Sequence, residues 1–138
     1  MVIPDEVLQA CQDRIPIVVG PTASGKTAFA IQLALRINGE IISVDSRQVY
    51  KGFCIGTSQP KPEELKSVKH YLINCLDPEE VVSAGKYCRW VWKIIEEIKN
   101  RHKLPVLAGG TLLYIKSICN GIIDEADSSS RIREKLEN

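Results

Sequence analysis

Eight consecutive residues near the start of the chain have the types and spacing that bind phosphate. They are Gly20, Pro21, Thr22, Ala23, Ser24, Gly25, Lys26 and Thr27, and they fit the P-loop pattern G-x-x-x-x-G-K-S/T. Glycine permits backbone conformations that turn successive N–H groups toward one anion. Lys26 adds a full positive charge, and the Thr27 hydroxyl can ligate Mg²⁺. The pattern predicts a phosphate site without specifying the compound; the alternative is a glycine-rich turn with no ligand.

A second group of candidates begins at Asp45, which follows the apolar run 40–44. Asp45 has three possible roles: it could position Mg²⁺, act as a general base, or cap the loop that it starts. Ser46, Arg47 and Gln48 come next, and all three can form hydrogen bonds. Gln48 could read the edge of an adenine. The alternative for these three residues is a polar, solvated loop.

A third candidate is Thr111, which follows Gly109 and Gly110 after the apolar run 104–108. In ordinary P-loop ATPases a buried strand ends in an acidic residue that serves magnesium and the attacking water. Glycines let the backbone approach a ligand closely, and Thr111 offers a hydroxyl at a helix start, either to a ligand or as an N-cap. The lack of an acid at this position weakens the interpretation as a nucleotide hydrolase.

Strands and helices are predicted to alternate along the chain. We expect strands at 15–19, 40–44 and 104–108 with a possible short strand at 71–73, and helices at 28–37, 62–66, 84–98 and 112–119, after a partly helical lead-in at 1–13. The helix at 28–37 is expected to end at Asn38 and Gly39 as a C-cap pair. The helix at 84–98 is expected to be amphipathic and capped by Ser83, with a core face made of Tyr87, Val91, Ile94, Ile95 and Ile98. This order predicts an α/β fold, a P-loop NTPase-like three-layer sandwich with a mainly parallel sheet. Ligands of such sheets bind beyond the carboxyl ends of the strands. The P-loop, Asp45 and Thr111 are therefore expected on one rim.

Composition places the chain among soluble globular domains. It has 138 residues, of which 44% are hydrophobic and 25% charged, so one domain with its own core is expected. The net charge of +1 argues neither for nor against a nucleic-acid partner. No apolar run approaches the ~20 residues of a membrane span, and the acidic N-terminal stretch is unlike a secretory signal.

The cysteines favour a reducing compartment, either the cytoplasm or the interior of an organelle. They are Cys11, Cys54, Cys75, Cys88 and Cys119, and no two form C-x-x-C. Their odd number and scattered positions favour free thiols over disulfides or a zinc site. His70 and His102 are too far apart in sequence to suggest a local metal pair.

Six segments resemble the tRNA dimethylallyltransferase family, also called tRNA isopentenyltransferases. They are G-P-T-A-S-G-K-T at 20–27, I-S-V-D-S-R-Q-V-Y-K-G at 42–52, I-G-T at 55–57, L-D-P at 76–78, S-A-G-K-Y at 83–87 and L-P-V-L-A-G-G-T-L-L-Y at 104–114. The resemblance covers nearly the whole chain in the family's order. The P-loop alone is unspecific, whereas D-S-R-Q-V-Y with G-G-T-x-L-Y at this spacing is specific.

The resemblance implies transfer of a dimethylallyl group from its diphosphate to the exocyclic amine of an adenosine in the tRNA anticodon loop. The P-loop, residues 20–27, would hold the prenyl diphosphate rather than ATP. Lys26, the loop amides and Mg²⁺ bound by Thr27 would stabilise the departing pyrophosphate. Asp45 would accept the amine proton, and Ser46, Arg47 and Gln48 would hold the extruded adenosine. Thr111 would line the channel where the two substrates meet.

The chain also departs from the family pattern. Family members are longer, so we expect a P-loop catalytic core at 1–121, with 122–138 as the start of an inserted helical domain or a tail, and an incomplete sheet. Lys69, Tyr71 and Asn74 replace the proline, histidine and aspartate of the family segment P-H-H-L-I-D, which bears on tRNA binding. The alternatives are a small-molecule kinase of the P-loop class, an isopentenyltransferase acting on free adenine nucleotides, and a non-catalytic binding module.

Overall fold

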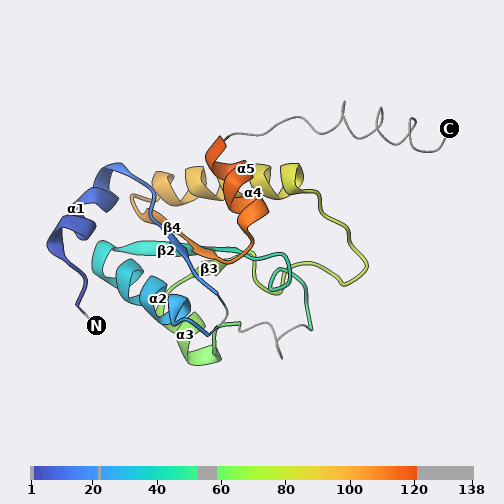
Figure 1. Cartoon of the computed structure of the whole chain (residues 1–138), viewed down its shortest axis with the longest axis horizontal. Coiled ribbons are helices and arrows are strands. Elements are labelled where there is room, and N and C mark those ends of the chain that lie inside the picture. Colours follow the sequence, from blue (N-terminus) through green and yellow to red (C-terminus); the bar gives the residue numbers. More distant parts are fainter. Residues whose placement is uncertain (1, 22, 53–58, 121–138) are drawn as a thin grey trace.

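A four-stranded parallel sheet forms the centre of the protein (Figure 1). The structure, a computed structural model, describes residues 2–21, 23–52 and 59–120. The strands are β1 (Ile17–Val19), β2 (Gly39–Val44), β3 (His70–Tyr71) and β4 (Leu104–Gly109), in the spatial order β1-β4-β2-β3. The helices are α1 (Asp5–Asp13), α2 (Lys26–Ile37), α3 (Pro62–Ser67), α4 (Ala84–Asn100) and α5 (Leu112–Asn120).

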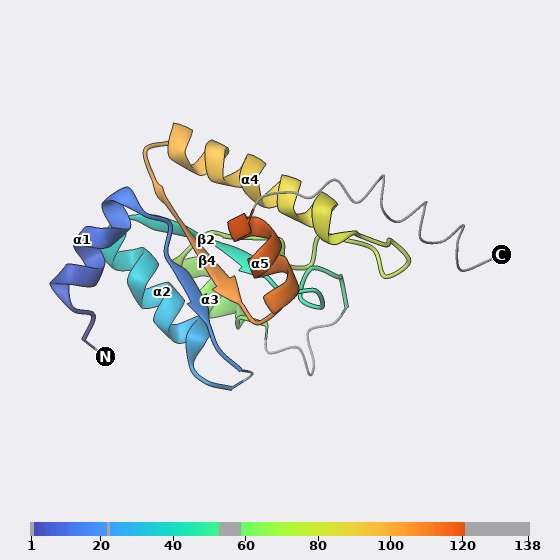
Figure 2. The same cartoon turned by 45° about the horizontal axis from the view of Figure 1, so that its top comes forward.

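Helices cover both faces of the sheet, which confirms the three-layer α/β prediction. Figures 1 and 2 show α4 and α5 on one face and α2 on the other. Alternate side chains of each strand enter different cores. Ile42 and Leu107 pack with α4 and α5, whereas Ile41 and Val106 pack with α1 and α2. Within the described part of the chain, no helix is both long and apolar enough to cross a membrane.

The predicted amphipathic helix is confirmed as α4. Ser83 caps it, because its hydroxyl accepts a hydrogen bond of 3.1 Å from the N–H of Lys86. Of the residues predicted to face the core, Tyr87, Val91, Ile95 and Ile98 are buried, whereas Ile94 is half-buried. Helical spacing of apolar residues was therefore sufficient to place this element.

All four strands differ slightly from their predicted ranges: β2 begins at Gly39 rather than Glu40, and β4 ends at Gly109 rather than Ala108. β1 begins at Ile17 rather than Ile15; its pairing with β4 starts at the carbonyl of Pro16, which accepts from the N–H of Leu107, because proline has no N–H to donate. β3 covers His70 and Tyr71 rather than 71–73. Leu72 has a φ of 62°, which takes the backbone out of the extended conformation and ends the strand.

The helix boundaries are close to those expected. α2 begins at Lys26, two residues before the predicted start, and ends at Asn38 in the left-handed conformation predicted for the C-cap. α5 continues one residue beyond the predicted end at Cys119. The predicted segment 122–138 and the residue Gly121 lie outside the described residues, so the domain boundary stays a prediction.

The register of the strands aligns the segments that follow them. Val44 of β2 and Val19 of β1 both pair with Gly109 of β4. The P-loop, Asp45 and Gly110 therefore start at the same level, at one edge of the sheet. Gly109 has to lack a side chain, because a Cβ there would lie 2.0 Å from the carbonyl oxygen of Val44.

The opposite, amino-terminal edge carries a buried charge. Glu40 in β2 is 4% exposed and pairs with Arg101 and with Lys103 (3.7 Å), while Tyr71 donates a hydrogen bond of 2.8 Å to the same carboxylate. Burial by itself raises the pKa of Glu40, but the hydrogen bonds of Tyr71 and Arg101 and the two positive charges outweigh it, so the pKa is lowered. Glu40 therefore joins β2, β3 and the α4–β4 turn as an anion.

Candidate active site

The P-loop has the backbone geometry of an anion site. Gly25 has a φ of 84° and Ala23 a φ of 63°, so left-handed residues alternate with right-handed ones. Such alternation directs successive N–H groups to one side. α2 begins immediately afterwards at Lys26, so its positive dipole end points at the same place. Thr22 lies outside the described residues.

Close contacts keep the P-loop compact. A Cβ on Gly20 would lie 2.6 Å from the hydroxyl of Ser24, so a larger residue at this position would require the Ser24 side chain to move. The N–H of Ser24 donates to the carbonyl oxygen of Pro21 at 3.2 Å. The ammonium of Lys26 folds back over the loop and lies 3.4 Å from the same oxygen. The positive charge is thus held beside the amides that would bind phosphate.

Asp45 stands just beyond the carboxyl end of β2 and caps the loop that follows. Its Oδ1 accepts hydrogen bonds from the N–H groups of Arg47 (2.8 Å) and Gln48 (3.1 Å). The capping role considered from the sequence is therefore observed. The loop therefore orients one oxygen of the Asp45 carboxylate, Oδ1.

Thr111 connects the end of β4 to the end of β2. Its Oγ1 accepts a hydrogen bond of 3.0 Å from the N–H of Ser46 and lies 3.5 Å from the Ser46 hydroxyl. The N–H of Thr111 lies 3.4 Å from the carbonyl oxygen of Val44. Thr111 therefore fixes the backbone on the C-terminal side of Asp45.

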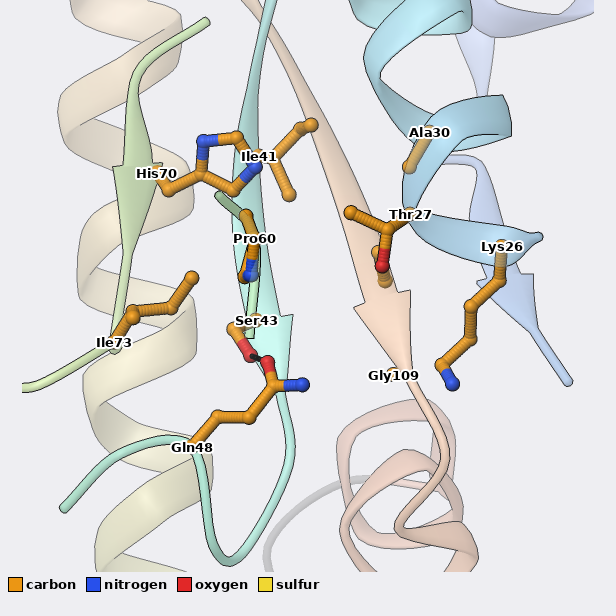
Figure 3. A pocket seen from close by; sticks show the side chains of 11 residues that line it. Lys26, Thr27, Ala30, Ile41, Ser43, Gln48, Pro60, His70, Ile73 and Gly109 are labelled. Carbon is orange, nitrogen blue, oxygen red and sulfur yellow. Dashed lines mark hydrogen bonds between the residues drawn. The ribbon is translucent and has the colours of Figure 1, made fainter. Parts of the chain in front are cut away.

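A pocket lies between α2, β2 and β3 beside the P-loop. It is lined by Lys26, Thr27, Ala30, Ile41, Ser43, Gln48, Pro60, His70, Ile73, Ala108 and Gly109. Figure 3 shows Lys26 and Thr27 on one side of the end of β4 and Gln48 on the other, with their polar groups directed into the same space. Asp45, Ser46, Arg47 and Thr111 lie at the same sheet edge but are not among the residues that line this pocket. The pocket therefore combines a cationic phosphate side with an apolar wall.

Two polar residues of the pocket were not singled out from the sequence. Ser43 lies within β2 and donates a hydrogen bond of 3.1 Å to Oε1 of Gln48, which orients that amide. His70 in β3 has its Nδ1 2.8 Å from the carbonyl oxygen of Val68. Burial lowers the pKa of His70, although the Val68 carbonyl and Glu64 oppose the shift. A polar residue inside an otherwise apolar strand was the available signal for Ser43.

The residues that depart from the family segment have structural contacts. Tyr71 binds Glu40, and Lys69 lies over the ring of Tyr71 with its ammonium 4.9 Å from the ring centre. Asn74 accepts a hydrogen bond of 3.0 Å from the side chain of Gln59. None of the three lines the pocket.

The described residues contain no group of three His, Cys, Asp or Glu side chains that could hold a metal ion. A Mg²⁺ site at the P-loop does not need one, because Mg²⁺ keeps most of its shell as water and substrate phosphate oxygens. The hydroxyl of Thr27, directed toward the same space as the Lys26 ammonium in Figure 3, is a suitable oxygen ligand. The cysteines described by the structure, Cys11, Cys75, Cys88 and Cys119, are free thiols.

Comparison with known proteins identifies the family. The family model described as "IPP transferase" matches residues 48–138, more than half of the chain. The chain belongs to the IPP transferase family. It is 47% identical over 125 residues to tRNA dimethylallyltransferase 1 of Syntrophotalea carbinolica, covering 89% of this chain and 40% of the relative. It is 53% identical over 127 residues to tRNA dimethylallyltransferase of Staphylococcus aureus, covering 88% of this chain and 41% of the relative.

Solved IPP transferase structures share the fold. The tRNA isopentenylpyrophosphate transferase of Staphylococcus epidermidis superposes with a TM-score of 0.71 at 40% identity, over 91% of this chain and 43% of that protein. A eukaryotic dimethylallyltransferase acting on tRNA gives a TM-score of 0.76 at 33% identity, over 83% of this chain and 28% of that protein. These neighbours confirm the P-loop NTPase-like fold. The chain spans about two fifths of the length of the curated relatives it matches.

Proposed function

We propose that the protein containing this chain transfers a dimethylallyl group from dimethylallyl diphosphate to the exocyclic amine of an adenosine in the anticodon loop of tRNA. The observation that carries the proposal is the strand register, which brings the P-loop and Asp45 to one edge of the sheet. An anion site and a carboxylate side by side suit a reaction that releases pyrophosphate and a proton. The names of the relatives supply the substrate class.

In the proposed reaction the amine nitrogen attacks the allylic carbon of the prenyl group. The carbon–oxygen bond to the diphosphate breaks, and its electron pair leaves with pyrophosphate. The P-loop amides and Lys26 stabilise the charge that grows on the leaving group. Thr27 would hold Mg²⁺, which would neutralise part of that charge. Asp45 takes the proton from the amine.

The acceptor adenosine would be held on the opposite side of the strand ends from the P-loop. Gln48 lines the pocket with its amide oriented by Ser43, and Ser46 and Arg47 follow Asp45 in the same loop. Contacts from these residues would offset the few kcal/mol needed to take a base out of its stack. In this proposal Thr111 supports the loop and borders the space where the substrates meet.

The test uses the complete protein, labelled dimethylallyl diphosphate and tRNA. Asp45→Ala should lower kcat by about 10²- to 10⁴-fold, the usual contribution of a general base, while diphosphate still binds. Asp77→Ala is the matched control, because that carboxylate is exposed and pairs only with Lys51 at 3.2 Å among the described residues. Normal turnover by Asp45→Ala would show that the base is assigned wrongly.

Acceptor and donor competition separate the alternatives. Transfer to tRNA but not to free adenine nucleotides supports the proposal, and the reverse result supports a nucleotide isopentenyltransferase. ATP that displaces dimethylallyl diphosphate and donates its terminal phosphate would instead indicate a kinase. Lys26→Ala should weaken dimethylallyl diphosphate binding without changing the fold, because Lys26 is half-buried at the P-loop and its ammonium contacts only the Pro21 carbonyl among the described residues.

A further inference from the structure

The end of β2 that carries Asp45 lacks a neighbouring strand on one side. The N–H of Ile41 donates to the carbonyl oxygen of Lys69, on the β3 side. Because alternate residues of a strand direct their N–H and C=O groups to the same side, the C=O of Ser43 and the N–H of Asp45 also face that side. β3, however, ends at Tyr71, and Leu72 turns away with its φ of 62°. β3 therefore cannot satisfy these two groups.

Tyr87 of α4 occupies the place of the missing strand. Its hydroxyl donates a hydrogen bond to the carbonyl oxygen of Ser43, and the side chain is 0% exposed. Burial raises the pKa of Tyr87 far above its usual value, although the nearby backbone of Asp45 opposes the shift. The phenol thus stays protonated and donates to Ser43.

The ring of Tyr87 is held firmly by its neighbours. It stacks on Tyr114 of α5 with ring centres 4.4 Å apart and an interplanar angle of 26°, and it contacts Trp90 with ring centres 6.4 Å apart. Both helices lie on the same face of the sheet (Figure 2). The position of the hydroxyl is therefore set by the core rather than by solvent.

Packing alone does not explain the hydroxyl. A phenylalanine would fill the same apolar face of α4, whereas a phenol has to find partners inside the core to offset its desolvation. The partner that it finds is the carbonyl oxygen of Ser43, two residues before Asp45. The hydroxyl of Tyr87 therefore stabilises the carboxyl end of β2 rather than α4 itself.

We propose that Tyr87 is a positioning residue that holds the backbone of Asp45 in place for proton transfer. The inference rests on the proposed role of Asp45 as the base. Three contacts then fix this carboxylate: Tyr87 on the strand before it, Thr111 on the N–H of Ser46 after it, and the hydrogen bonds of its own Oδ1. Tyr87 itself touches no substrate and exchanges no proton.

The experiment compares Tyr87→Phe with Tyr71→Phe in the complete protein. Both substitutions remove one hydroxyl that binds β2, but Tyr71 binds Glu40 at the other end of the strand. Tyr87→Phe should lower kcat roughly 10- to 100-fold, as expected for a small misplacement of a reacting group, with KM for dimethylallyl diphosphate unchanged within about twofold. Tyr71→Phe should lower the melting temperature about as much as Tyr87→Phe does, but it should leave kcat within about twofold of wild type.

Equal kcat values for the two variants would overturn the proposal, because a purely structural hydroxyl would affect both alike. A double variant adds a second criterion. In an Asp45→Asn background Tyr87→Phe should leave the residual rate unchanged, since Tyr87 acts through Asp45. A further loss as large as that in the wild-type background would also overturn it. Failure of the proposed function is recognised separately, because Asp45→Asn would then keep normal turnover.

A measurement on the unsubstituted protein decides the matter if Tyr87→Phe does not fold. The hydroxyl proton of Tyr87 should exchange slowly with solvent and show a nuclear Overhauser effect to the amide proton of Asp45. A rapidly exchanging hydroxyl, or a slow one without this effect, would overturn the proposal independently of any activity.

Discussion

Replacing Gly109 by alanine should separate the two strands that carry the active site. The added Cβ would meet three backbone atoms of Val44: the carbonyl oxygen at 2.0 Å, the carbonyl carbon at 2.5 Å and Cα at 3.0 Å. No side-chain rotation can relieve these contacts, so β2 and β4 have to move apart by more than 1 Å. We expect a loss of about 3 kcal/mol, the upper part of the range for overpacking, and a melting temperature lower by about 10 °C.

Gly110→Ala is the matched control for this prediction. Its added Cβ would lie 3.4 Å from the carbonyl oxygen of Gly20, which is ordinary contact, so its stability should change by less than about 1 kcal/mol. Urea denaturation and thermal unfolding of the complete protein measure both variants. The separation at Gly109 should also weaken prenyl transfer, because Asp45 directly follows Val44. If Gly109→Ala is as stable as Gly110→Ala, the close approach of the strands is not needed and the reasoning from register fails.

Three further predictions concern other parts of the molecule. Glu40→Gln should lower stability by about 1–2 kcal/mol at neutral pH, because its partners are partly exposed. The pKa of Glu40 is lowered from 4.5 in the folded state, so its contribution to stability is fully present above pH 4.5. This contribution is lost as the pH falls through the lower pKa of the folded state. The urea midpoints of the wild type and the variant should therefore converge at acidic pH. Ser83→Ala should cost about 1 kcal/mol by removing the cap of α4, as chemical denaturation can show. Pyrophosphate with Mg²⁺ should raise the melting temperature of the wild-type protein, and it should raise that of Lys26→Ala much less. An equal rise in the two proteins would show that the anion binds at a site other than the P-loop.

The sequence predicted the elements whose signals are local. The P-loop pattern lies between an apolar run and a helical pattern, and the alternation of such units specifies a parallel sheet. The polar residues at the ends of β2 and β4 could then be assigned to one edge, and the structure confirms this for Asp45 and Thr111. Ser83 and the buried face of α4 followed from capping and periodicity.

The remaining features depend on contacts between distant residues. Tyr87 has the helical spacing of a core residue, and only the end of β3 at Leu72 gives its hydroxyl a partner. Likewise Glu40 begins a strand predicted to be buried, and Arg101 and Lys103, which compensate its charge, come some sixty residues later. Spacing within one segment contains no information about either pair.

The position of Glu40 also means that stability and activity depend on opposite ends of β2 and can be changed separately. Heat tolerance depends in part on the carboxylate at the start of β2, whereas the chemistry depends on the carboxylate that follows its last residue. Apolar replacement of a buried ion network can preserve or increase stability when all partners are exchanged together. Joint replacement of Glu40, Arg101 and Lys103 by apolar residues, together with Tyr71→Phe, is therefore a route to a more heat-resistant variant with unaltered turnover.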